Sequence, residues 1–156
     1  MASAVFTEAI LIIASVIIAA SLAGVVMTKV SSFQSTFTQT TENQKQTVLT
    51  NIKILYAQNQ TTTSVSAWVK NVGTYQITNT QNIDVYFGQI GSVSRIPYNP
   101  GSGAGWTFSS PVSVWSQAGT VQMNLSNLPS IQCAKTYQLQ VTTPNGVSDQ
   151  YFVTFC

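Results

Sequence analysis

The chain has 156 residues, a formal net charge of +2 and only 6% charged residues, against roughly 25% in ordinary soluble domains. Ser, Thr, Asn and Gln together make up roughly 40% of the sequence, so neutral polar groups solvate it in place of charge. No basic block is present to bind phosphates, which argues against nucleic acid as a partner. Histidine is absent and the acids are few, so the sequence predicts neither an enzyme nor a metal or other cofactor.

The first predicted element is a hydrophobic helix. Residues 9–27 read AILIIASVIIAASLAGVVM, without a charge, Pro, Asn or Gln. As a helix this segment is about 28 Å long, close to the hydrocarbon thickness of a bilayer. We therefore expect a single-pass membrane span. A signal peptide cleaved near Ala23 is disfavoured because no Lys or Arg precedes the apolar run. A pilin-type helix buried in a filament core has the same composition.

Small residues recur along this helix. They form two sets at helical spacing, Ser15, Ala19 and Ala23 in one and Ala20 and Gly24 in the other. Such faces let helices approach closely, which favours a homo-oligomer or a filament. The alternative is that Ala and Gly are simply common in membrane spans.

Apolar residues continue at helical spacing beyond the span. No Gly or Pro interrupts residues 25–70, so we expect one helix from about residue 4 to about 50, composed of the span and a stalk. The apolar residues whose spacing fits one helical stripe are Val30, Phe33, Phe37, Val48, Ile52 and Leu55, of which the last two lie beyond the expected end of the helix. This defines residues 1–50 as the helical part of the chain.

Residues 51–156 are predicted to form the second domain. Apolar and polar residues alternate there in short runs separated by turn signals, of which Pro144-Asn145-Gly146 is the clearest. Seven or eight strands are expected, and the fold class is α+β, a long N-terminal helix followed by an immunoglobulin-like antiparallel β-sandwich. The expected strands centre on Ile54, Ala67, Val85, residues 112–114, Met123, Leu139 and Val153, with a loop at residues 97–105.

The position of this domain relative to the membrane is judged from its composition. Lys29 and Lys45 follow the span, and the positive-inside rule alone would place the domain in the cytoplasm. The charge bias is small, and a polar domain with cysteines and glycosylation sequons is typical of the outer side. We expect an extracellular domain.

Several residues of this domain are candidate sites. Cys133 and Cys156 either form a disulfide or remain two thiols. The sequons at Asn59 and Asn124 are possible N-glycosylation sites, and Asn59 is the better acceptor because Asn124 falls in a predicted strand. Trp68 is expected in the core. Trp106 is either a core residue or a contact for a partner.

Three segments resemble a known family. The segment from Glu8 to Ser15, followed by Ala19-Ala20 and Ala23-Gly24, resembles the start of the archaellum accessory protein FlaG. The segment AWVKNVG at residues 67–73 resembles a strand and turn shared by archaellins, FlaF and FlaG, and TTPNGV at residues 142–147 resembles their last hairpin.

The resemblance implies a type IV pilin-like protein of the archaellum stator, closest to FlaG. Such a protein would be held in the membrane, would assemble with a FlaF-type partner and would connect to the S-layer protein. Glu8 is then the candidate residue for processing or assembly. No basic residue and Gly precede Ala9 as a processing site, which favours the accessory protein. The alternatives are a filament-forming archaellin or pilin-like subunit, and an anchored adhesion domain.

Overall fold

The computed structural model describes residues 2–155, with side chains from Val5 onward. The chain divides into two compact units, Met1–Asn43 and Gln44–Cys156. A single helix, α1, extends from Ala2 to Leu49 and confirms the predicted helix almost to the residue. Its last turn belongs to the second unit.

The first unit is helix alone. Among the described residues of this unit the large apolar side chains lie at the surface of the helix: Ile10 is 66% exposed and Leu22 is 65% exposed. Hydroxyl groups in the helix donate to carbonyl oxygens one turn back, as Ser21 does to Ile17 at 2.8 Å and Thr36 to Ser32 at 3.0 Å. In residues 9–27 both polar side chains, Ser15 and Ser21, are satisfied in this way, so the surface of that segment suits an apolar environment.

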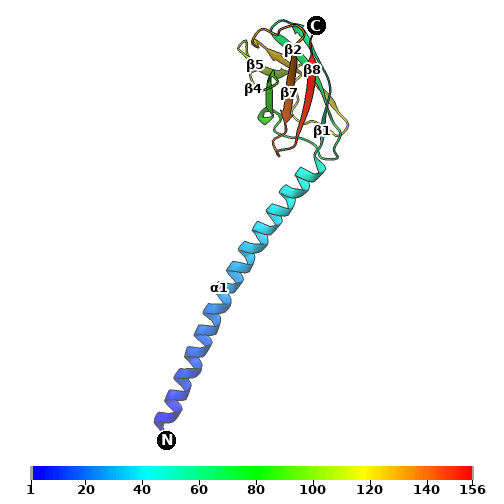
Figure 1. The fold of residues 1–156 in the computed structure, drawn as a ribbon. Helices are drawn as coiled ribbons and strands as arrows, with labels where there is room; N and C mark the ends of the chain where they lie inside the picture. Colours follow the sequence, from blue (N-terminus) through cyan, green and yellow to red (C-terminus); the bar gives the residue numbers. More distant parts are fainter. Residues whose placement is uncertain (1, 156) are drawn as a thin grey trace. The chain divides into compact units, whose positions relative to one another are not determined.

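The second unit contains an antiparallel β-sandwich, which confirms the predicted fold class. Among the described residues it has eight strands in two four-stranded sheets, of order β1-β2-β6-β5 and β4-β3-β7-β8 (Figure 1). The bounds are β1 Ile52–Thr61, β2 Ser64–Asn71, β3 Asp84–Gln89, β4 Ser92–Ile96, β5 Gly105–Phe108, β6 Thr120–Ser126, β7 Thr136–Thr142 and β8 Ser148–Thr154, with a short 3₁₀ helix η1 at Thr80–Asn82.

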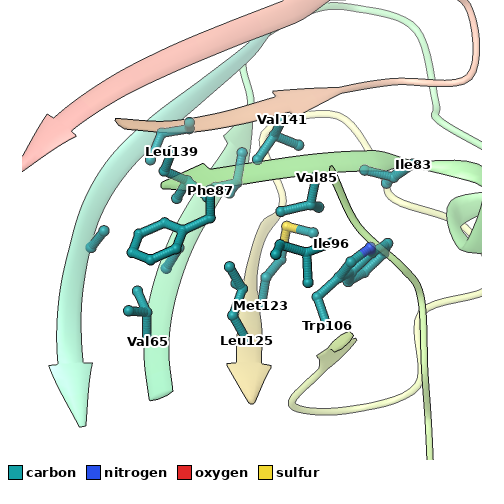
Figure 2. Close-up of a cluster of buried hydrophobic side chains, with 14 of the residues drawn as sticks. Val65, Ile83, Val85, Phe87, Ile96, Trp106, Met123, Leu125, Leu139 and Val141 are labelled. Carbon is teal, nitrogen blue, oxygen red and sulfur yellow. The ribbon is translucent and has the colours of Figure 1, made fainter. Parts of the chain in front are cut away.

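The core lies between the two sheets. Every second residue of a central strand points inward, as in β7, where Tyr137, Leu139 and Val141 are all buried. Figure 2 shows Phe87 and Val85 of one sheet facing Met123 and Leu125 of the other, all of them buried. This packing of two inner faces is the main source of stability for the unit.

One predicted strand is wrong and two strands were missed. Residues 112–114 are not a strand, and Val114 is 46% exposed in an irregular segment that follows Pro111. The missed strands are β4, in which only Ile96 is buried, and β5, which has only four residues. β4 lacks the alternating pattern that identifies a half-buried strand, and in β5 the alternation is limited to Trp106, Thr107 and Phe108.

Candidate assembly surfaces

The apolar surface of α1 is the first candidate surface. By length and composition alone, the helix could cross a membrane. Gly24 has no atom within 4 Å of the position that a Cβ would take, so its face is open. Ser15 donates its hydroxyl to the Ile12 carbonyl at 2.7 Å, which leaves this small side chain folded against its own helix. The predicted helix-packing role of Ser15, Ala19, Ala20, Ala23 and Gly24 stays a prediction, as does the role of Glu8.

The end of α1 is held by the loop that follows β2. The backbone N–H groups of Thr74 and Tyr75 donate to the Leu49 carbonyl at 2.9 and 3.1 Å. A helix leaves its last carbonyls without partners, and these bonds supply two donors to one of them. A Cβ on Gly73 would lie 2.4 Å from the Leu49 oxygen and 2.4 Å from the Asn51 nitrogen. Only glycine lets the loop approach the helix end so closely.

Asn71 fixes the shape of that loop. Its side chain is completely buried, donates to the Tyr75 carbonyl at 2.8 Å and accepts from the Gly73 N–H at 3.1 Å. Asn71 and Gly73 of the segment VKNVG therefore both shape the turn that caps α1.

A second turn reaches the same helix end from the β7–β8 hairpin. The side-chain amide of Asn145 donates to the Gln46 carbonyl at 3.2 Å and to the Thr50 hydroxyl at 2.5 Å. The backbone carbonyl of Asn145 accepts from the Thr47 hydroxyl at 3.3 Å. We call Asn71, Gly73 and Asn145 the helix-end cluster. It makes the last turn of α1 part of the sandwich unit.

The two sheets have four edges, and three of them are covered. The β1 and β8 edges meet, since the Asp149 carboxylate accepts from the Ile54 N–H at 2.8 Å and pairs with the Lys53 ammonium at 3.0 Å. The β5 edge is paired with the segment before it, where Trp106 exchanges backbone bonds with Pro97 and Asn99. Covered edges cannot template the addition of another strand.

The remaining edge, β4, is open along its outer side. In the described part of the chain, β3 is the one strand that pairs with β4. The β4 residues Ser92, Ser94 and Arg95 are exposed. A groove of about 380 Å³ lies beside it, between the β3–β4 hairpin and the loop at Pro129. Gly88 lines the groove, and a Cβ there would meet the Ser92 carbonyl oxygen at 2.2 Å. The β4 edge and its groove are the best candidate on the sandwich for a strand-pairing partner.

The two predictions about tryptophans need correction. Trp106 is fully buried, so it is a core residue and the prediction that it contacts a partner is wrong. It packs edge-on against Tyr98 and Phe108, with ring centroids 4.9 and 5.1 Å apart. Trp68 was expected in the core but is only half-buried, where it packs on Tyr56 across β1 and β2. The third tryptophan, Trp115, is buried.

Cys133 is disulfide-bonded in the structure, and the Ala134 N–H donates to the Phe155 carbonyl at 3.2 Å beside it. Its expected partner, Cys156, lies outside the described residues, so the pairing stays a prediction.

The two sequon asparagines differ in exposure: Asn59 is exposed on β1, and Asn124 is half-buried on β6. Within the described residues, no three His, Cys, Asp or Glu side chains are placed to hold a metal ion.

A long apolar helix joined to a β-sandwich, with an open sheet edge and polar surface, defines a structural protein of the pilin-like class. The sequence profile of the family "Archaeal-type flagellin" matches residues 2–152. The chain belongs to this family and has a structural role in the archaellum, the archaeal motility machinery. The family resemblance drawn from the sequence is confirmed.

Solved structures agree with this assignment. The archaellum periplasmic stator protein FlaG from Sulfolobus acidocaldarius is 34% identical, with a TM-score of 0.61 over 67% of this chain and 100% of that one. The stator protein complex of FlaF and FlaG from the same organism matches with the same identity and TM-score over 67% and 90%. The archaeal flagellum of Methanospirillum hungatei strain JF1 shares the fold, with a TM-score of 0.77 over 96% and 92% at 12% identity. A search of curated protein sequences finds no match.

Proposed function

We propose that this chain is a stator subunit of the archaellum. Residues 9–27 hold it in the cytoplasmic membrane and the sandwich lies outside the cell. The observation that carries the proposal is the 34% identity to FlaG over the whole of the solved FlaG chain, because that protein is described as a periplasmic stator protein. A chain of this kind acts mechanically, as a fixed element against which a rotating filament is driven, and it has no reaction to catalyse.

The helix-end cluster suits this mechanical role. Backbone bonds to Leu49 and side-chain bonds from Asn145 attach the last turn of α1 to two different loops of the sandwich. A load applied to the sandwich therefore reaches the helix through several hydrogen bonds in parallel, and a single flexible linker does not have to carry it.

The partner we propose is an accessory protein of the FlaF type, bound by strand addition at the β4 edge. The FlaF–FlaG complex supports the choice of partner, and the open edge with its groove supports the position. Strand addition gives affinity through backbone hydrogen bonds, while the groove accepts a side chain and gives specificity. That partner would in turn bind the S-layer protein and so connect the stator to the cell envelope.

The stator role is tested by deleting the gene in the source organism. Cells are then supplied either with the full chain or with a chain that lacks residues 51–156. We expect the shortened chain to leave assembled filaments on the cells and to abolish swimming. Swimming at the normal rate with the shortened chain would contradict the proposal.

The β4 edge is tested by the double variant Ser92→Lys, Ser94→Lys, because lysines on an edge strand oppose strand addition. We expect at least tenfold weaker co-purification of the FlaF-type partner. The double variant Ser109→Lys, Ser113→Lys adds the same charge at exposed positions away from β4 and should bind normally. Equal loss in both variants would show that charge, and not the β4 edge, is responsible.

A filament subunit is the second candidate, favoured by the fold shared with an archaeal flagellum along 96% of the chain. Cryo-microscopy of purified surface filaments separates the two. A filament wall built of this chain would favour the subunit, and its absence from the wall would favour the stator.

A further inference from the structure

The two N-glycosylation sequons occupy very different positions in the sandwich. Asn59-Gln60-Thr61 lies at the end of the edge strand β1, and Asn124-Leu125-Ser126 lies within the inner strand β6. An acceptor asparagine needs an accessible side-chain amide and a hydroxyl two residues later. We propose that Asn59 carries an N-linked oligosaccharide and that Asn124 does not.

Asn59 meets both requirements in the folded protein. Its side chain is exposed and makes no hydrogen bond to any other side chain or backbone group that the structure describes. Its register partner Val65 is fully buried and lies on the same face of the sheet, so the core ends at this pair and Asn59 is exposed at the end of that face. The hydroxyl of Thr61 is also at the surface, 2.7 Å from that of Ser64.

Asn124 fails the first requirement. Its carbonyl oxygen accepts from the Ser66 hydroxyl at 2.8 Å and from the Gln122 amide at 3.1 Å. Its backbone pairs with Ser66 of β2 on one side and Thr107 of β5 on the other. A sugar on the nitrogen of this half-buried amide would stand over a continuous sheet, beside the Ser66 and Gln122 side chains that bond its oxygen.

The modification is a group transfer from a lipid-linked oligosaccharide, catalysed by a membrane-bound oligosaccharyltransferase of the host. The Asn59 amide nitrogen bonds to the anomeric carbon of the first sugar and loses one proton to a base of that enzyme. The bond between the anomeric carbon and the phosphate oxygen breaks, and the lipid phosphate leaves with its electron pair. No oxidant or reductant is needed.

This inference rests on the proposed function, since the enzyme acts outside the cell, where the sandwich is placed. It also extends that function. Asn59 is seven positions beyond Ile52, about 23 Å along β1, so a hydrophilic chain there covers the far end of the β1 edge. The open β4 edge belongs to the other sheet and stays available for a partner.

The full chain is produced in an archaeal host whose own surface proteins carry N-linked glycans, and its tryptic peptides are analysed by mass spectrometry after reduction. The two sequons fall in separate peptides, residues 54–70 and 96–135. We expect the first peptide to be heavier by one oligosaccharide and the second to have the mass of the bare polypeptide. Asn59→Gln and Thr61→Ala should abolish the added mass, while Thr61→Ser keeps the hydroxyl and should retain it.

Protease treatment of intact cells is run beside this measurement to locate the sandwich. A bare 54–70 peptide in a sandwich that the protease cleaves would overturn the glycosylation proposal and leave the proposed function intact. A sandwich protected from the protease would overturn both. Sugar on Asn124, or sugar that persists in Thr61→Ala, would also overturn the assignment of Asn59.

Discussion

The side-chain amide of Asn145 donates a hydrogen bond of 3.2 Å to the carbonyl oxygen of Gln46, in the last turn of α1. The two residues are 99 positions apart in the sequence, so the bond joins the beginning of the sandwich unit to its last hairpin. Asn145 also accepts from the Thr143 hydroxyl at 2.6 Å, which orients its side chain within that hairpin.

Asn145→Ala removes these contacts together. The half-buried Gln46 carbonyl and the buried Thr50 hydroxyl then each have one donor fewer. We therefore expect a loss of about 1–3 kcal/mol in the free energy of unfolding. Denaturant unfolding followed by tryptophan fluorescence measures it, because all three tryptophans belong to the sandwich unit. The control Asn82→Ala changes an exposed side chain and should stay within about 0.5 kcal/mol of the wild-type chain. Equal effects from the two variants would contradict a special role for Asn145.

Gly73→Ala tests the close approach of the β2 loop to the helix end. The new methyl group would overlap two backbone atoms, which cannot move aside as a flexible side chain can. We expect a loss of at least about 2 kcal/mol, by the same fluorescence measurement. Gly24→Ala is the matched control, since it meets no atom within 4 Å and lies in the helical unit. Normal stability of Gly73→Ala would show that the loop can retreat from α1 without cost.

The sequence was sufficient to locate α1 and six of the eight strands. The helix is an unbroken run without Gly or Pro outside position 24, and the six strands have alternating apolar residues that the core requires. The strands β4 and β5 could not be found in this way. β4 lies at an edge and exposes most of its side chains, while β5 is four residues long and follows a glycine-rich loop.

The helix-end cluster shows a second limit of prediction from the sequence, which is that contacts between distant segments cannot be read from local patterns. Its residues were visible as turn signals at Asn71-Val72-Gly73 and Pro144-Asn145-Gly146, because turn chemistry is local. Their shared contact with the end of α1 is not local. Likewise, Trp106 follows a Gly-rich loop and was open to two interpretations from the sequence, and only the pairing of β5 with β6 places its ring inside the sandwich.

Asp149 provides a test of how β1 and β8 are held together. Its side chain is 16% exposed, bonds the Ile54 N–H and pairs with Lys53. Asp149→Ala leaves that N–H unsatisfied and should cost about 1–3 kcal/mol, whereas Asp149→Asn keeps an acceptor and should cost less. Asp84→Asn is the control, because the ion pair of Asp84 with Arg95 is more exposed and contributes about 0–1 kcal/mol. In denaturant titrations we expect the loss in the free energy of unfolding to be largest for Asp149→Ala, smaller for Asp149→Asn and smallest for Asp84→Asn. A larger loss in Asp84→Asn than in Asp149→Ala would contradict this expectation.

The small-residue face of α1 predicts self-association in the membrane. In the double variant Ala19→Leu, Ala23→Leu, bulky side chains would hold neighbouring helices apart. We expect a several-fold fall in the cross-linked oligomer of the full chain in lipid vesicles. The control Ile17→Leu, Ile18→Leu replaces large residues by large residues on the same helix and should leave cross-linking unchanged. If the alanine variant cross-links as well as the wild-type chain, the small residues do not form the contact.

The absence of histidine predicts a stability that does not respond to mildly acidic conditions. The free energy of unfolding changes with pH only where the folded and unfolded chains bind different numbers of protons, and histidine is the side chain that ordinarily titrates between pH 5.5 and 7. We expect the unfolding midpoint temperature to stay within about 2 °C across that range. Ile131→His supplies the contrast, since position 131 is 7% exposed and burial lowers the pKa of an imidazole below its unfolded value. The unfolded variant then binds more protons, so its midpoint should fall as the pH falls from 7 to 5.5. A wild-type midpoint that falls equally would show that a group other than histidine titrates on unfolding.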